Sequence, residues 1–402
     1  MIKNDKPTLW YFGIEPLKAR YTYQLSNFWM PAAFGIFKDK VNFHPIHVIQ
    51  EPAEIKVGAV LDAVGRGQYA MAQCSQFLEL IRNNEVKDGD IIFLQDFWTP
   101  GIESVFYALD LYGYKDIKFY ARNWAQSSDE YDFTFNMRSW MRSYELGLAK
   151  RLNGMIVGST MHRDLLRQDG FECPIHVMSM PVDDSEIRNK IPNWQEKVTQ
   201  PKKNVVMFSS RLDKEKNPYF MLEVAKQFLA KNLDFEWHIT TSGKVLRSMI
   251  PGVIDDFRAY AKIEPRFKLL ENLSKEEYYN ELSSNLIIFN SSLQDWVSFT
   301  LVEGTAFGID IVYPNFRGFP ENVPNNRLYT AFDVESAIKT LESTILDYEE
   351  KKSIKDYGIV ERSNLGRLTE AWIVCNNPNF ELNIWHEAEY CKKLIYNDRF
   401  DN

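Results

Sequence analysis

Short apolar segments alternate with segments of helical character along most of the chain, and this alternation constrains the fold most strongly. In the second half the apolar segments are Asn204–Phe208, Phe235–Thr240, Phe267–Leu270, Leu286–Phe289 and Ile309–Tyr313. In the first half they are Thr8–Phe12, Phe43–Ile49, Asp90–Leu94, Ile117–Tyr120, Met155–Val157 and Ile175–Met178. Short buried strands that alternate with helices form parallel sheets. The sequence therefore predicts an α/β protein with two doubly wound, Rossmann-like halves.

Local signals mark several helices of the second half. Asn217 before Pro218 is an N-cap followed by proline at the first helical position, and Ser274 with Glu277 forms a capping box. A further helix is expected near 245–262. These helices fall between the predicted strands, as the βα alternation requires.

The length of 402 residues is enough for two or three domains. We expect a first Rossmann-like domain over 1–185, a polar linker over 186–203 and a second Rossmann-like domain over 204–384. An amphipathic helix near 385–402 is expected to cross back onto the first domain. Two such domains would face each other across a cleft, and open α/β sheets bind ligands beyond the carboxyl ends of their strands.

Composition and charge exclude several classes of protein. The net charge of −8 disfavours a generic nucleic-acid binder, which needs clustered Lys and Arg to neutralise phosphates. Four cysteines without CxxC spacing indicate neither a zinc site nor a disulfide framework; they are Cys74, Cys173, Cys375 and Cys391. The first residues do not read as a signal peptide, and no apolar run approaches the length of a membrane span. We therefore expect a cytoplasmic protein with no integral membrane segment.

The turn Ser209–Pro218 joins a predicted strand to a predicted helix and is rich in cationic side chains. Arg211 offers a planar fork of donors to phosphate oxygens, and Lys216 adds a mobile charge. The helix N-terminus behind them also favours an anion. We expect this turn, including Ser210, to bind a diphosphate. The alternative interpretation is a solvated charged turn.

A second motif, Asp295–Glu303, also follows a predicted strand. It places one carboxylate in a loop and another inside the next helix, with Ser298, Phe299 and Thr300 at the helix start. Amides at a helix N-terminus bind phosphate, and the carboxylates can accept hydrogen bonds from sugar hydroxyls. The alternative is a surface Asp and an ordinary mid-helix Glu. Both motifs follow strands of one predicted sheet, which favours a shared site.

These stretches resemble a known family. Phe208–Pro218 resembles the "GRL…KN/KG" turn of GT-B glycosyltransferases, especially the family-4-like retaining group. Ser291–Pro314 resembles the E-x7-E signature of that group, and Gly318–Glu321 resembles its "GG-x-P-E" turn. The resemblance continues in order over about 204–341. It implies the GT-B fold of two facing Rossmann-like domains.

The resemblance also implies roles for individual residues. Arg211 and Lys216 would bind the donor diphosphate and stabilise the leaving group, and Glu303 would contact the nucleotide ribose. Asp295 would contact the transferred sugar, while the amides around Ser298 would bind its phosphate. The chain departs from the family at three positions, where Asp295 replaces Glu, Ser298 replaces Gly and Asp310 replaces Pro. The implied reaction moves a hexosyl or pentosyl group from a nucleotide-diphosphate sugar to a hydroxyl, with retention and without metal or cofactor.

The first half is expected to bind the acceptor through loops that follow its strands. The candidate acceptor residues are Glu15, Arg20, Asp96, Trp98, Asn123, Trp124 and Glu130. Asp129 is a candidate catalytic residue that would orient or deprotonate the acceptor hydroxyl, as could Asp96 or Glu130. His162 opens a predicted helix and could approach the same region. Solvated acids and core indoles are the alternative for each of these positions.

Two acceptor classes fit the aromatic-rich loops of a chain with 14% aromatic residues. One is a glycan or small metabolite. The other is a hydroxymethylated pyrimidine in DNA, with an extruded base stacked on aromatic side chains. The first half has a faint resemblance to phage-encoded transferases, while the acidic balance counts against DNA. A nucleotide-sugar epimerase or an inactive structural module of the same fold also fits the motifs, whereas a periplasmic-type binding protein would need a secretion signal.

Overall fold

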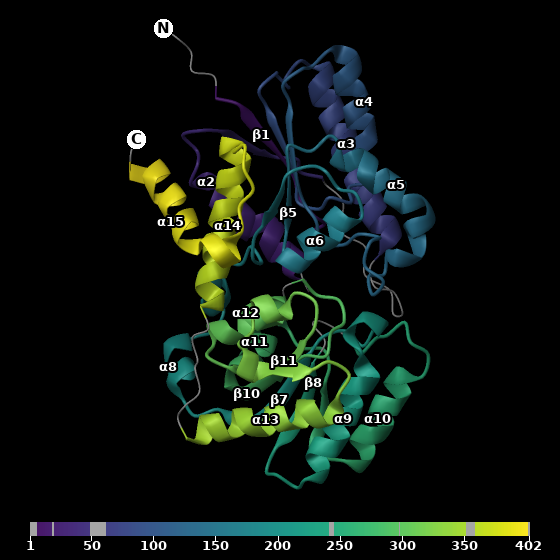
Figure 1. Cartoon of the computed structure of the whole chain (residues 1–402), viewed down its shortest axis with the longest axis vertical. Coiled ribbons are helices and arrows are strands. Elements are labelled where there is room, and N and C mark those ends of the chain that lie inside the picture. The colour runs from purple at the N-terminus through teal and green to yellow at the C-terminus, as the bar shows by residue number, and fades with distance from the viewer. Residues whose placement is uncertain are drawn as a thin grey trace. The chain divides into compact units, whose positions relative to one another are not determined.

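The structure is a computed structural model that describes residues 6–17, 20–48, 62–240, 245–296, 298–350 and 358–400. The described residues form two compact units (Figure 1). The first unit contains the described residues up to 181 together with 362–400, and the second contains 182–361. Each unit is an α/β structure, which confirms the predicted fold class.

The first unit contains a parallel sheet with the strand order β2-β1-β3-β4-β5-β6. Its strands are β1 (Thr8–Phe12), β2 (Asn42–Pro45), β3 (Ile91–Leu94), β4 (Lys118–Arg122), β5 (Gly154–Val157) and β6 (Ile175–Val177). All registers are parallel, for example Leu9 beside Ile91 and Ile91 beside Lys118. The carboxyl ends of the strands therefore share one edge of the sheet.

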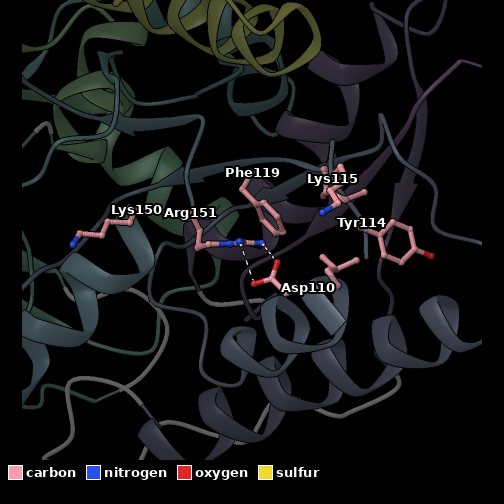
Figure 2. A pocket seen from close by; sticks show the side chains of 8 residues that line it. Asp110, Tyr114, Lys115, Phe119, Lys150 and Arg151 are labelled. Atoms are coloured by element: carbon pink, nitrogen blue, oxygen red, sulfur yellow. Dashed lines mark hydrogen bonds and ion pairs between the residues drawn. The ribbon is translucent and has the colours of Figure 1, made fainter. Parts of the chain in front are cut away.

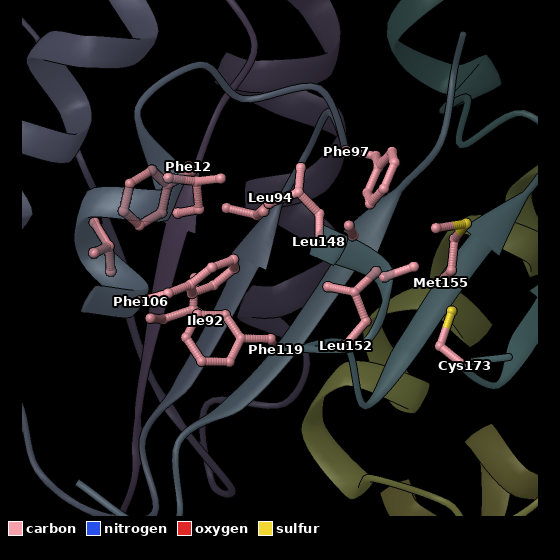
Figure 3. Close-up of a cluster of buried hydrophobic side chains, with 14 of the residues drawn as sticks. Phe12, Ile92, Leu94, Phe97, Phe106, Phe119, Leu148, Leu152, Met155 and Cys173 are labelled. Atoms are coloured by element: carbon pink, nitrogen blue, oxygen red, sulfur yellow. The ribbon is translucent and has the colours of Figure 1, made fainter. Parts of the chain in front are cut away.

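Helices cover both faces of this sheet. One face packs against α3 (Ala63–Arg82), α4 (Ile102–Tyr112), α5 (Arg138–Ala149) and α6 (Thr160–Gln168). Figure 3 shows that core, where Phe106 and Phe119 pack edge to face at 4.8 Å between ring centroids. The other face packs against α2 (Met30–Gly35) through Phe34, and against α14 (Ile359–Asn376) through the bond between Arg122 and Glu370. Tyr120 also bonds to Asn377, directly after α14. The short helix α1 (Tyr21–Gln24) and a π-helical turn at Leu25–Trp29 precede α2, and α15 (Ile384–Phe400) ends the unit.

The second unit contains a parallel sheet with the strand order β12-β11-β10-β7-β8-β9. Its strands are β7 (Lys203–Ser209), β8 (Glu236–Thr240), β9 (Phe267–Leu270), β10 (Asn285–Phe289), β11 (Asp310–Asn315) and β12 (Leu328–Thr330). One face carries the core with α9 (Pro218–Ala230), α10 (Val253–Ile263) and α13 (Val334–Glu349). The helices that bear on the site are α11 (Lys275–Ser284) and α12 (Phe299–Ala306).

The structure divides and bounds some segments differently from the expectation. The segment expected as a linker carries α7 (Asp184–Arg188) and α8 (Trp194–Thr199) and belongs to the second unit. The return to the first unit begins at 362, because α14 joins that unit together with α15. The helix expected near 245–262 begins only at Val253, since Gly252 at its N-cap has a left-handed φ of 80°.

Candidate functional site

The cationic turn of the second unit lies at the carboxyl end of β7. Ser210 directly follows the strand and is half-buried, and a short 3₁₀ turn over Lys214–Lys216 leads to α9. Pro218 opens α9 as expected, but Asn217 makes no side-chain cap bond. Its backbone is left-handed instead, with φ 49°, a conformation that Asn tolerates better than most residues. The turn between β7 and α9 therefore has a defined backbone conformation.

Hydrogen bonds join this turn to the loop that follows β10. The Ser291 hydroxyl donates to the Lys216 carbonyl at 2.7 Å, and the Leu293 amide donates to the Glu215 carbonyl at 2.7 Å. The Lys216 ammonium in turn donates to Asp295 Oδ2 at 3.0 Å and to the Gln294 carbonyl at 3.0 Å. The structure thus brings Lys216 and Asp295 together, although 79 residues separate them in the sequence.

Arg211 is held by two carboxylates of its own turn. Its Nη1 donates to Asp213 Oδ2 at 2.9 Å, and its Nη2 donates to Glu215 Oε1 at 2.6 Å. Both acids are buried, while the Arg211 side chain is 22% exposed. Asp213 and Glu215 were not predicted as site residues, although their spacing from Arg211 was a usable signal in the sequence. The pairs fix the guanidinium at the carboxyl edge of the sheet.

Glu303 on α12 is buried and accepts three hydrogen bonds from α11. Tyr279 Oη and Lys275 Nζ donate to Oε1 at 2.9 and 3.1 Å, and Tyr278 Oη donates to Oε2 at 2.9 Å. The Lys275 ammonium also lies 4.8 and 4.6 Å from the two tyrosine ring centroids. Burial, and then the Glu303 charge, raise the pKa of Tyr278 well above its usual value, so it is a phenol donor. The structure confirms the capping box at Ser274. The two adjacent tyrosines that follow it were the sequence signal that could have identified these hydrogen-bond donors.

Close packing fixes α12 on the sheet beside Glu303. A Cβ atom at Gly304 would collide with Cδ1 of Ile288 in β10, so a larger residue there would require the Ile288 side chain to shift. At the helix start, the Ser298 and Thr300 hydroxyls lie 2.7 Å apart, and Ser298 makes no side-chain cap bond to the helix. Phe299, the first residue of α12, is half-buried.

In the first unit, two predicted acceptor residues meet through a residue that sequence reasoning missed. Arg66 Nη1 donates to both carboxylate oxygens of Glu15 at 3.1 and 3.0 Å, and its Nη2 donates to Asp96 Oδ2. The Trp98 amide donates to Asp96 Oδ1 at 3.0 Å. The Trp98 ring lies 5.8 Å from the ring of Trp140, which is half exposed. No local pattern marks Arg66 in the sequence.

Trp124 and Asn123 lie just beyond β4. The Trp124 indole donates to the Gln95 carbonyl at 2.6 Å, and the Arg122 guanidinium lies 4.6 Å from its ring centroid. Asn123 is buried, and its Nδ2 donates to Met155 Sδ at 3.5 Å. Arg20 lies before α1 as its N-cap residue, in extended conformation. The structure therefore brings Glu15 and Asp96 into one cluster and places Trp124 against the backbone that directly follows β3.

The acidic loop after β4 contains residues of different exposure. Asp129 is buried and accepts a bond from the Tyr131 amide at 3.1 Å, whereas Glu130 is exposed. Asp132, not singled out as a candidate, is also buried, and the Thr134 amide and hydroxyl donate to its Oδ1 at 2.8 and 2.7 Å. Burial raises the pKa of Asp132 to about 7. Burial also disfavours the charged form of His162 and lowers its pKa to about 3, so this imidazole is neutral.

The chain resembles solved structures of glycosyltransferases. A TarM mutant from S. aureus, in complex with fondaparinux, α-GlcNAc-glycerol and UDP, is 19% identical with a TM-score of 0.56, over 76% of this chain and 59% of that chain. Sucrose-phosphate synthase from Thermosynechococcus elongatus is 12% identical with a TM-score of 0.59, over 98% and 100%. A glycosyltransferase from Rickettsia africae is 14% identical with a TM-score of 0.54, over 98% and 100%. At these identities the likeness shows the fold alone.

The family comparison concerns the second unit. Residues 190–360 match the model described as glycosyl transferases group 1. The chain has the two-unit α/β fold of these solved glycosyltransferases, and its second unit carries the matched family segment. The matched segment contains the turn with Arg211 and Lys216 and the motif from Asp295 to Glu303. Among curated protein sequences, no significant match is found.

The first unit also has a hollow of about 190 Å³, shown in Figure 2. Its lining combines the end of α4, the residues after α5 and the start of β4. Arg151 and Asp110 form an ion pair there at 3.0 Å. The hollow lies at the amino end of β4, and thus at the opposite edge of the sheet from the loops of Glu15 and Asp96.

Among the described residues, no group of three or more His, Cys, Asp or Glu side chains could hold a metal ion. None of the described helices is both long enough and apolar enough to cross a membrane.

The raised pKa of Asp132 predicts a pH-dependent stability difference. Between about pH 4 and pH 7 the unfolded state ionises Asp132 while the folded state keeps it protonated, so the residue costs stability as pH rises. Asp132→Asn removes this titration and keeps an acceptor for Thr134. In urea unfolding, the free energy of unfolding of the variant relative to that of wild type should rise by roughly 2–4 kcal/mol between pH 4 and pH 8. A difference that is constant over this pH range would contradict the prediction.

Proposed function

We propose that this protein is a glycosyltransferase that moves a sugar from a nucleotide-diphosphate sugar to a hydroxyl of a glycan or small metabolite, with retention of configuration and without a metal or cofactor. The observation that carries the proposal is the bonded junction between the two motifs of the second unit. Lys216 contacts Asp295 directly, and the Lys216 and Glu215 carbonyls are bound by the loop after β10. Retention is supported by the resemblance of Ser291–Pro314 to the retaining group.

The parts of this junction match the charges that develop in the reaction. Sugar transfer leaves negative charge on the departing diphosphate, which fixed cations stabilise. Arg211 and Lys216 supply that positive charge, and their acidic partners hold them in place before the donor binds. Asp295 can accept a sugar hydroxyl with the carboxylate oxygen that does not bind Lys216. The N-terminus of α12 suits a phosphate oxygen, because the start of a helix favours an anion.

Glu303 is suited to bind the ribose of the donor. Three donors from α11 hold its carboxylate in one orientation, and a carboxylate has about four acceptor positions in all. The Glu303 carboxylate is therefore already oriented, and binding a ribose hydroxyl requires little further loss of side-chain entropy. Lys275, Tyr278 and Tyr279 act through Glu303 as positioning residues.

A nucleotide panel tests the donor site. UDP, GDP, ADP and their sugars are added to the protein, and a ligand that binds the folded state raises the melting temperature Tm. At least one diphosphate should do so. Glu303→Ala should weaken that ligand about 10- to 100-fold, because hydrogen bonds to a charged group contribute about 1.5–3 kcal/mol.

Controls separate loss of the site from loss of the fold. Glu335→Ala, an exposed carboxylate of α13 in the same unit, should leave the affinity unchanged. A panel in which no nucleotide diphosphate or nucleotide sugar raises Tm would overturn the proposed function. A hydroxymethylcytosine-containing duplex in the acceptor panel tests the DNA alternative, and donor isomerisation without an acceptor tests the epimerase alternative.

A further inference from the structure

Arg66 connects two loops of the first unit that the sequence treats as unrelated. It lies in the first turn of α3, and its guanidinium binds Glu15 from the loop after β1 and Asp96 from the loop after β3. Its Nη2 also lies 3.5 Å from the Trp98 carbonyl. The three charged side chains are only 13%, 10% and 11% exposed. One cation therefore holds two carboxylates in a nearly buried cluster, which we call the Arg66 clamp.

The Arg66 clamp lies at the edge of the sheet where ligands bind in this class of fold. β1 and β3 are parallel neighbours, with Phe12 beside Leu94, so their carboxyl ends are adjacent. Glu15 and Asp96 follow these ends within three residues. Open α/β sheets bind their ligands beyond the carboxyl ends of the strands. The clamp thus lies at the sheet edge where folds of this class bind their ligands.

The charge of the clamp selects the chemistry of its ligand. Two carboxylates and one guanidinium leave one excess negative charge in a region of low exposure. Such a site repels phosphate, and its remaining carboxylate lone pairs accept hydrogen bonds from hydroxyl groups. Trp98 borders the clamp, and its ring contacts the half-exposed indole of Trp140. The two indoles add an apolar face beside the carboxylates. Carboxylate acceptors beside indole faces match a sugar, which combines hydroxyl edges with apolar ring faces.

We propose that the Arg66 clamp is the acceptor subsite and that it takes an uncharged, hydroxyl-rich group, a neutral sugar. Glu15 and Asp96 bind acceptor hydroxyls, and Arg66 is a positioning residue that sets the spacing of the two carboxylates. The proposal rests on the function proposed above, because it assigns the acceptor of that reaction. It excludes phosphorylated sugars and nucleic acid as acceptors.

The test compares matched neutral and charged probes by ligand-observed NMR and by transfer assays. The probes are methyl glucoside, maltose, glucose 6-phosphate and a hydroxymethylcytosine-containing DNA duplex. Wild type should bind the neutral sugars at least ten times more tightly than the two phosphate-bearing probes. Asp96→Asn and Arg66→Met should each weaken neutral-sugar binding, or raise the acceptor KM, at least tenfold. The affinity for the nucleotide diphosphate should not change.

Two further variants distinguish positioning from general support of the fold. Arg66→Lys should restore part of the acceptor binding lost in Arg66→Met, because one cation can still bridge the carboxylates. Glu15→Gln removes the excess negative charge, so it should narrow the preference for methyl glucoside over glucose 6-phosphate.

Several outcomes would overturn the inference. They are tighter binding of a phosphate-bearing probe, no binding of any neutral sugar at tens of millimolar, or unchanged acceptor binding in both Asp96→Asn and Arg66→Met. If Arg66→Met does not fold, Glu15→Gln and Asp96→Asn decide the question. Failure of the proposed function is distinct, because it appears as loss of nucleotide binding in the wild-type protein.

Discussion

Replacing Lys216 with alanine is expected to lower kcat by about 100- to 1,000-fold, with little change in Tm. Removal of one fixed electrostatic contact to a developing charge typically costs this much. Lys216 is suited to that role because its ammonium is anchored by Asp295 and the Gln294 carbonyl, both at 3.0 Å. The measurement is initial-rate kinetics with the donor identified by the nucleotide panel.

A neighbouring lysine provides the matched control. Lys214 lies in the same 3₁₀ turn but is exposed, and Lys214→Ala should leave kcat within about twofold. Both variants lose one positive charge from the same turn, so a general electrostatic effect would act on them alike. A Lys216→Ala enzyme with near-native kcat would contradict the assignment of this residue to the leaving group.

Replacing Glu370 with alanine is expected to lower the free energy of unfolding by about 3–5 kcal/mol, because it leaves a buried charge without its partner. Arg122 at the end of β4 pairs with Glu370 on α14, and their side chains are 1% and 0% exposed. Burial lowers the pKa of Arg122 and raises the pKa of Glu370, while each charge opposes the shift of the other. Arg122 also donates to the Ser179 carbonyl at 2.8 Å, so it cannot leave the interior easily.

Urea unfolding measures the loss of unfolding free energy in Glu370→Ala. A solvent-exposed ion pair serves as the control. Lys339 and Glu335 on α13 form an ion pair whose side chains are 70% and 78% exposed. Glu335→Ala should change the unfolding free energy by less than about 0.5 kcal/mol, since exposed pairs contribute little. A loss below 1 kcal/mol for Glu370→Ala would show that the buried pair does not hold α14 to the first unit.

The predictable part of this protein lies in local patterns. Strand segments such as Leu286–Phe289 and the capping box at Ser274 were identified from a few neighbouring residues, and the structure contains both. The turn with Arg211 and the motif from Asp295 to Glu303 were placed after strands by the same reasoning. Because parallel strands end at one edge, their shared location followed from the fold class. Helix boundaries such as Val253 were less accurate, since residues just before Gly252 carry helical composition without helical backbone.

The sequence by itself determined the α/β class, the parallel sheets and the two motifs of the second unit, because strand and helix periodicities are properties of adjacent residues. Only the tertiary structure decided the partners of the charged groups. Arg66 meets Glu15 across 51 positions of sequence, and Arg122 meets Glu370 across 248. Such pairs depend on strand register and on which helix packs over which strand. The orientation of Glu303, the buried pair of α14 and the Arg66 clamp therefore required the folded chain.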